Sequence, residues 1–216
     1  MNEFFEAIQK GDAARVAELL TSDKTLLDAR QNNATPILVA IYHGKPEIAR
    51  LLADSGAKVS IAEACALGDS DRVRSMLDAD PQSLHSRSED GYPCLGLAVF
   101  FRNGELARDL IARGADVNAA ANNAQRVAPV HAAAAVCDHE TMRALLERGA
   151  DPNARQQMHY AALHGAASRG DIEMAKLLLA HGADRDAKAS DGMTPADVAT
   201  KYGKAEFAEW IRSVVT

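Results

Sequence analysis

The sequence predicts an all-α solenoid, in which short pairs of helices stack one on the next. Three markers that recur in phase support this prediction. A Gly-Ala pair ends each of four leucine-rich runs, and Gly149 and Gly182 are 33 residues apart. A turn residue stands 12 positions before the glycine, and a Thr-Pro, Ala-Pro or Ala-Ala pair ends 8 positions before that turn. Periods of this length are typical of repeat proteins.

Each repeat unit consists of two helices. Proline in the third marker suits the first turn of a helix, where its missing N–H has no cost. Between the turn and the Gly-Ala pair, apolar residues such as Ile48, Leu51 and Leu52 follow helical spacing. We therefore expect helix, tight turn, helix and glycine cap, with turns near Gly11, Gly44, Gly68, Arg102, Cys137, Gly170 and Gly203.

Two short motifs carry a family resemblance. Val130-His131-Ala132-Ala133 and Leu163-His164-Gly165-Ala166 match an L-H-x-A signature. The segments 114–118 and 149–153 match a G-A-D-x-N ending. With these motifs the chain resembles ankyrin repeats over essentially its whole length. The resemblance implies a single domain, residues 1–216, of about seven helix-turn-helix repeats joined by short β-hairpin fingers.

The predicted repeats differ in length. Their approximate bounds are 1–30, 31–59, 60–88, 89–123, 124–156, 157–189 and 190–216. The step from Gly44 to Gly68 is only 24 residues, so we expect one finger to be missing before the third repeat. This would leave a notch in the finger row between Tyr42 and Phe100. Residues 4–20 also match residues 61–77, which indicates a duplicated block. The frame of the fourth repeat stays open by one residue, and the last repeat is expected to cap the stack.

The histidines and acids predict structural roles and no catalytic or metal site. The resemblance implies that His131 and His164 hydrogen-bond to the backbone of neighbouring fingers. Acidic residues at 69–71 and 138–140 open second helices, where a carboxylate caps the free N–H groups. No nucleophile motif, phosphate loop or zinc signature occurs, so we expect neither an enzyme nor a cofactor. The three cysteines are odd in number and suit reduced thiols.

Composition narrows the classes of partner and compartment. The chain has 24 Lys and Arg against 30 Asp and Glu, a net charge of −6, which disfavours nucleic acid. Charged residues interrupt every apolar segment, so no membrane span is expected. Two acids in Met1–Glu6 do not fit a secretion signal. We therefore expect a cytoplasmic protein.

The resemblance also implies where a partner would bind. Ankyrin partners commonly dock on the concave side, which the finger tips and first helices form. All four tyrosines and two of the five phenylalanines fall at the family's variable positions on that side. Aromatic rings concentrate binding energy at interfaces. The predicted partner-binding residues are Tyr42, His43, Tyr92, Phe100, Phe101, Tyr160, Arg169 and Tyr202. The alternative is that Phe100 and Phe101 pack between first helices while the tyrosines only line the groove.

The pattern leaves three functional hypotheses. The leading one is a non-enzymatic module that binds another protein and acts as a scaffold or an inhibitor. The second is self-association through the apolar groove. The third is an enzyme or small-ligand sensor that uses the notch near Phe100, Cys94 and His43.

Overall fold

A computed structural model describes residues 2–214, so the outermost residues of the first and last predicted repeats, 1 and 215–216, lie outside the description. The described residues form fourteen α-helices and no strand. The α-helices are α1 (Asn2–Lys10), α2 (Ala13–Ser22), α3 (Pro36–Tyr42), α4 (Pro46–Asp54), α5 (Ile61–Leu67), α6 (Ser70–Ala79), α7 (Cys94–Phe100), α8 (Gly104–Ala112), α9 (Pro129–Val136), α10 (His139–Glu147), α11 (Ala162–Arg169), α12 (Ile172–Ala180), α13 (Pro195–Lys201) and α14 (Ala205–Ser213). Three 3-10 helices are η1 (Lys24–Asp28), η2 (Pro81–His85) and η3 (Gln157–His159). The all-α prediction is confirmed.

The helices follow one another in pairs that a tight turn joins. The seven predicted turn residues all have left-handed backbone, with φ from 58° at Cys137 to 78° at Gly11. Five of them are glycines, which adopt this conformation without steric cost. Arg102 (φ 63°) and Cys137 adopt it as well, because the turn geometry is imposed by the two helices it joins. The predicted turn positions are therefore correct.

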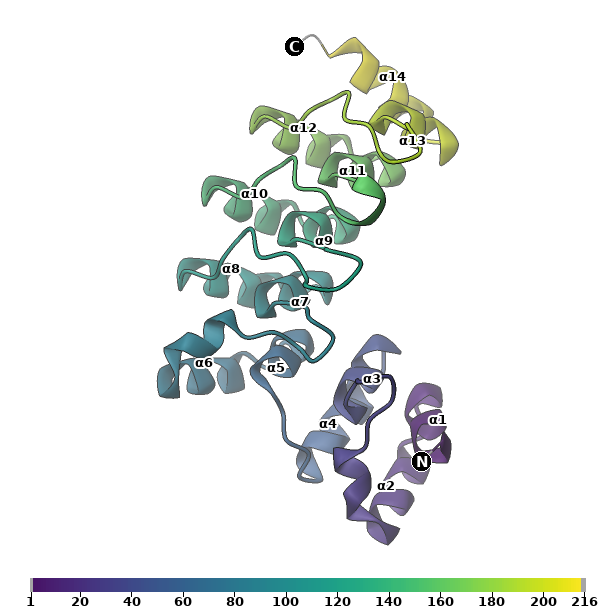
Figure 1. The fold of residues 1–216 in the computed structure, drawn as a ribbon, viewed down its shortest axis with the longest axis vertical. Coiled ribbons are helices and arrows are strands. Elements are labelled where there is room, and N and C mark those ends of the chain that lie inside the picture. The colour runs from purple at the N-terminus through teal and green to yellow at the C-terminus, as the bar shows by residue number, and fades with distance from the viewer. Residues whose placement is uncertain (1, 215–216) are drawn as a thin grey trace. The chain divides into compact units, whose positions relative to one another are not determined.

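The chain forms two compact units, one up to Cys94 and one from Leu95 onward, and each is described by itself. In the first unit, α1 packs on α2 and α3, and α3 packs on α4. In the second unit, α9, α11 and α13 form a row of inner helices, and α8, α10 and α12 form a row of outer helices (Figure 1). Apolar side chains such as Leu110, Leu145 and Leu178 are buried between the two rows.

Acidic residues begin the outer helices, as the sequence predicts. Asp138 Oδ1 accepts the backbone N–H of Thr141 at 2.9 Å, and Asp171 Oδ1 accepts that of Met174 at 3.0 Å. Asp69 does the same for Arg72 at 3.1 Å. Each carboxylate satisfies one of the free N–H groups at the start of its helix and opposes the positive end of the helix dipole. These acids are caps.

The duplicated block of the sequence recurs in the structure. The helix α2 and the 3-10 helix η1 have the same lengths as α6 and η2, and the two pairs are offset by 57 residues. Asp23 and Asp80 cap the two 3-10 helices by accepting the N–H two residues ahead. The first and third repeats thus end in a 3-10 turn, where the other complete repeats end in a Gly-Ala cap.

The fingers are present as loops, and among the described residues they form no strand. Two isolated antiparallel bridges occur, Gln31 with Ala34 and Arg87 with Pro93. Each hairpin is too short for a ladder of consecutive pairs, so the expected β-hairpins reduce to single bridges. In the second unit the fingers bond to one another through the backbone, since Ser190 N–H donates to Met158 C=O at 2.9 Å.

The connection between α4 and α5 is residues 55–60, and it contains neither a bridge nor a helix. It ends in a capping box, in which the buried Glu63 carboxylate accepts the N–H and hydroxyl of Ser60, both at 2.7 Å. The other oxygen of Glu63 accepts a hydrogen bond from the hydroxyl of Thr35, the cap of α3. Glu63 thereby joins the second repeat to the third without a finger.

The notch expected beside this connection is not left open in the first unit. The finger of residues 86–93 reaches back to the second repeat. Arg30 Nη2 lies 3.0 Å from Glu89 Oε1, and the Tyr42 hydroxyl donates to Asp90 Oδ2 at 2.5 Å. Because the third repeat contributes no finger, the finger of the fourth repeat contacts Arg30 and the end of α3 directly. The prediction of an open notch on this side was wrong.

Two buried histidines in the second unit each link an inner helix to backbone at or beside the next finger. His131 Nδ1 accepts the N–H of Ala128 at 3.0 Å, and its Nε2 donates to Ala154 C=O at 2.9 Å. His164 repeats the arrangement with Ala161 and Met193 C=O. Burial lowers the pKa of both imidazoles, so the neutral ring is favoured. The predicted structural role of these histidines is confirmed.

Candidate functional site

Four large apolar side chains are exposed among the described residues. Their exposed fractions are 40% for Tyr42, 51% for Phe100, 55% for Met158 and 58% for Tyr202. Tyr42 and Phe100 are the last residues of inner helices α3 and α7, Tyr202 caps inner helix α13, and Met158 lies in a finger tip. No outer helix among residues 2–214 carries such a side chain. The large exposed apolar groups therefore lie at the ends of inner helices and in a finger tip.

Three of the predicted residues lie in the first unit. Tyr42 is partly exposed, and its hydroxyl is held by Asp90. Partial burial of the phenol and the neighbouring carboxylate raise the pKa of Tyr42. His43 is exposed and its Nδ1 lies 2.9 Å from Val39 C=O, so the ring caps α3. Tyr92 is half-buried, and its N–H donates to Ser88 Oγ at 3.0 Å. Tyr42 and His43 are thus anchored at one end and accessible at the other.

Phe100, Phe101 and Tyr160 lie in the second unit. The rings of Phe100 and Phe101 meet edge to face with centroids 5.2 Å apart, and Phe101 is half-buried. The ring of Tyr160 packs on His164 with centroids 5.0 Å apart, and its hydroxyl donates to Asp191 Oδ2 at 3.3 Å. Partial burial and Asp191 raise the pKa of Tyr160. Phe101 and Tyr160 support the surface, while Phe100 projects from it.

Arg169 and Tyr202 are the last two of the predicted binding residues. Arg169 is the exposed last residue of α11 and lies near Cys137, where its charge favours the thiolate. Burial and Asp171 outweigh that charge, and the pKa of Cys137 is raised. The thiol of Cys137 is therefore not activated as a nucleophile. Tyr202 offers the most exposed large apolar side chain of the described residues.

A shallow apolar hollow lies beside Phe100. Its volume is about 140 Å³, and it lies within the second unit. Its walls are mainly small side chains of α9, α11 and the fingers: Val127, His131, Ala132, Ala135, Gln156, Ala161, Ala162 and Gly165. Small residues let another chain approach the helices closely. Neither Cys94 nor His43 lines this hollow, so it is not the ligand notch that the third hypothesis describes.

Met158 was not among the predicted binding residues. It has a left-handed backbone, φ 60°, which turns its side chain outward at the finger tip. The sequence signal was its place in a finger, five residues before the L-H motif. The prediction emphasised aromatic residues and therefore passed over this flexible apolar side chain.

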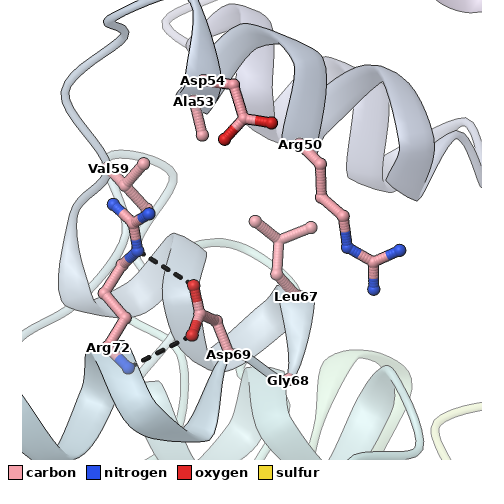
Figure 2. A pocket seen from close by; sticks show the side chains of 8 residues that line it. All are labelled: Arg50, Ala53, Asp54, Val59, Leu67, Gly68, Asp69 and Arg72. Atoms are coloured by element: carbon pink, nitrogen blue, oxygen red, sulfur yellow. Dashed lines mark hydrogen bonds and ion pairs between the residues drawn. The ribbon is translucent and has the colours of Figure 1, made fainter.

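A second cavity, of about 330 Å³, lies in the first unit between α4 and the α5–α6 turn. Figure 2 shows Arg50, Ala53 and Asp54 of α4 on one side and Leu67 with the paired Asp69 and Arg72 on the other. The Arg72 Nε to Asp69 Oδ2 distance is 2.9 Å.

The position of this cavity shows that the outer helices of the second and third repeats, α4 and α6, are offset along the stack. In the second unit, the starts of successive outer helices lie together, as His139 Nε2 and Asp171 Oδ1 do at 2.9 Å. Here the C-terminal half of α4 faces the start of α6. The short connection between α4 and α5 leaves too little chain to keep the two repeats in register. The cavity is therefore a consequence of the missing finger.

The other thiols are buried. Cys65 hydrogen-bonds with Cys94, and the Cys94 Sγ donates to Ser86 C=O at 3.3 Å. The contact with Cys94 and burial raise the pKa of Cys65. Both cysteines are part of the packed interior of the first unit, and Cys94 does not contribute to a surface site.

No helix within residues 2–214 is both long enough and apolar enough to cross a membrane. Comparison with curated proteins finds no match. A family model described as ankyrin repeats in three copies matches residues 61–156 and again residues 130–213, which together exceed half of the chain. Ankyrin repeats are in general protein–protein interaction modules, and proteins built from them are typically not enzymes. The repeated helix pairs, the histidine links between them and this match agree, and the chain belongs to the ankyrin repeat family.

Proposed function

We propose that this protein binds a partner protein through its finger tips and inner helices, and that it acts as a scaffold or an inhibitor. One observation carries the proposal: every large apolar side chain that is exposed among the described residues lies at the end of an inner helix or in a finger tip. Exposed rings of this kind are costly in water and provide binding energy when a partner covers them. The outer helices carry charged side chains instead.

The binding residues are Tyr42, Phe100, Met158 and Tyr202, with Arg169 as a charged contact. Phe101 and Tyr160 are partly buried, and they hold their neighbours Phe100 and His164 in position. His43 and Tyr92 belong to the first unit with Tyr42, and a partner would contact them when it covers that unit's fingers. The cytoplasm, where thiols stay reduced, is the compartment that fits free Cys65, Cys94 and Cys137.

The test is affinity capture from the cells that make the protein. The natural chain is compared with a Phe100→Ala, Met158→Ala, Tyr202→Ala variant and with an outer-helix control, Arg143→Ala with Lys176→Ala. Circular dichroism confirms that all three forms are folded. We expect one or more proteins to be retained by the natural chain and the control and lost by the triple variant. Equal retention by all three forms would reject the proposed surface.

Self-association is the second candidate for the same apolar groups. Sedimentation of the natural chain over a range of concentrations separates the two. A monomer at all concentrations supports a foreign partner. A dimer that the triple variant dissociates would favour self-association.

A further inference from the structure

Charge divides the second unit into two faces of opposite sign. We define the inner face as the finger tips 122–127, 155–160 and 188–193, together with the inner helices and their turns, 95–102, 129–137, 162–170 and 195–203. It carries six cations and two acids, namely Arg102, Arg126, Arg155, Arg169, Lys188 and Lys201 with Asp191 and Asp197. The outer helices α8, α10, α12 and α14 carry seven acids and four cations. The inner face is therefore positive although the whole chain has a net charge of −6.

The two acids of the inner face are already satisfied within it. Asp197 Oδ2 accepts the N–H of Thr194 at 3.0 Å and its hydroxyl at 2.7 Å. Asp191 accepts the N–H of Met193 at 3.1 Å and the hydroxyl of Tyr160 at 3.3 Å. These bonds lower the pKa of Asp197, which stays ionised but is turned toward its own helix.

Three cations of the same face have no such partner. Within residues 2–214, the side chains of Arg126, Arg169 and Lys201 form no ion pair or hydrogen bond, and all three are exposed. On the outer helices, Arg108 pairs with Glu140 at 3.3 Å and Lys176 with Glu173 at 2.7 Å, while Arg143 forms no ion pair within residues 2–214. An incoming acidic group would thus meet cations that no carboxylate of the described chain neutralises.

Two of these cations, Arg126 and Arg169, lie next to residues that line the apolar hollow beside Phe100. Arg126 directly precedes Val127, which lines the hollow. Arg169 follows Gly165, another lining residue, by four positions and so shares its helix face. Phe100 itself forms part of the wall and is half exposed. An apolar depression with cations beside it is complementary to a chain that alternates acidic and apolar side chains.

We propose that the inner face of the second unit binds an acidic peptide segment of the partner, which inserts an apolar side chain into the hollow beside Phe100. This inference rests on the proposed binding function and specifies the chemistry of its partner. A peptide is favoured over nucleic acid because the cations are few and are separated by apolar surface. A phosphate backbone is bound by a dense track of cations, and its affinity comes mainly from them.

The proposal is tested with the full chain and fluorescein-labelled random copolymers as probes, by fluorescence anisotropy. The probes are poly(Glu,Tyr), poly(Glu) and poly(Lys,Tyr), with poly(U) as the nucleic acid. The charge-reversed variant is Arg126→Glu, Arg169→Glu, Lys201→Glu. Its matched control on the outer side is Arg143→Glu, Arg148→Glu, Lys176→Glu, which changes the net charge equally. Circular dichroism verifies that each variant is folded.

We expect poly(Glu,Tyr) to bind more tightly than poly(Glu), and poly(Lys,Tyr) not to bind. Charge reversal on the inner face should weaken poly(Glu,Tyr) by about tenfold or more, and the outer control should change it by less than about twofold. Phe100→Ala should reduce the affinity for poly(Glu,Tyr) to that for poly(Glu). Higher salt should weaken binding by the natural chain and the outer control alike.

Three results would overturn the proposal. These are no binding of poly(Glu,Tyr), equal effects of the two charge-reversed variants, and tighter binding of poly(U) or poly(Lys,Tyr). The failure of this inference can be distinguished from the failure of the proposed function. If a cellular partner is lost by the apolar triple variant but kept by the charge-reversed variant, the binding surface stands and its acidic partner does not.

Discussion

At the residue scale, the two hydrogen bonds that each buried histidine forms contribute much of the stability of the stacked helices. His164 is fully buried, accepts one backbone N–H of its own helix start and donates to the C=O of Met193 in the next finger. Asn118 and Asn153 add similar links, since Asn153 Nδ2 donates to Gly182 C=O at 2.8 Å. One side chain therefore fixes both its own helix and the position of its neighbour.

Replacing His164 with Ala should lower the free energy of unfolding by about 2–3 kcal/mol, because two buried backbone groups lose their partner and a cavity remains. Urea unfolding followed by circular dichroism measures the loss. His85→Ala provides the control, since His85 is exposed and should change stability by less than about 0.5 kcal/mol. Equal midpoints for the two variants would contradict the structural role of His164.

The same histidines predict a pH dependence of stability. Burial lowers the pKa of His131 and His164 in the folded state below the ordinary value of about 6.5. The unfolded chain therefore binds protons more readily as pH falls below about 6.5, and stability is lost in that range. Unfolding free energies should be lower at about pH 5.5 than at about pH 7.5. A His131→Gln, His164→Gln variant should show a smaller difference, whereas His85→Gln should keep it. A stability that does not change over this range would contradict the prediction.

The sequence predicted these residues well where a motif sets their position. The L-H motif fixes His131 and His164 at the third position of an inner helix, from which the ring reaches the next finger. Asp138 and Asp69 were equally predictable, because a helix start needs an acceptor. The bonded state of Tyr42 was not, because it depends on a finger whose backbone path the sequence does not specify. Met158 could have been included from its place in a finger.

At the scale of the element, Glu63 shows how one helix start can join two repeats. Glu63→Ala should lower the unfolding free energy by about 2–4 kcal/mol, because Ser60 loses its capping box and the Thr35 hydroxyl loses its acceptor. Asp197→Ala is the matched control, since Asp197 forms an exposed capping box in the last repeat. It should cost only about 0.5–1 kcal/mol. Guanidinium unfolding of both variants measures the two losses of unfolding free energy. Similar losses would show that Glu63 does not link the third repeat to the second.

A second pair of substitutions separates packing from surface. Leu178 of α12 has 0% exposed area, so Leu178→Ala should cost about 2–5 kcal/mol through the cavity it opens. Phe100→Ala should change stability by less than about 1 kcal/mol, because half of its ring is already in water. Thermal unfolding followed by circular dichroism measures both. A large loss for Phe100→Ala would indicate that its ring packs between inner helices.

The helices themselves were predictable, but the offset between the second and third repeats was not. Proline and the turn residue mark where α3, α9 and α13 begin and end, and the Gly-Ala pair marks where α4, α8, α10 and α12 end. The missing finger could be counted from the 24-residue step between Gly44 and Gly68. The contact of Glu89 and Asp90 with the second repeat, which closes the resulting gap, could not be predicted. It depends on how far the neighbouring finger bends.

At the scale of the whole molecule, the links between repeats are unequal. In the second unit, histidine, asparagine and finger backbone bonds join consecutive repeats. In the first unit, the second repeat is tied to the third by the Thr35–Glu63 bond, and exposed contacts such as Arg30 with Glu89 add to it. Exposed ion pairs contribute little, at most about 1 kcal/mol. A linear array of this kind opens where its neighbour interactions are weakest.

Amide hydrogen exchange measures this difference directly. We expect the amides of α3 and α4 to exchange through partial opening at a lower free energy than those of α11 and α12. Glu63→Ala should speed exchange in α3 and α4 and leave α11 and α12 unchanged. Uniform protection across all four helices would show that the molecule opens as one cooperative unit.

The short connection at residues 55–60 also determines where the protein should open when its two ends are pulled apart. A chain pulled at its two ends transmits force through each contact between repeats in series. The step from α4 to α5 offers a buried carboxylate, two surface bridges and the water-accessible cavity of Figure 2, where the steps of the second unit offer stacked fingers. Under tension this joint should yield first and release the first two repeats as an extensible tether, while the inner and outer helices of the later repeats stay folded.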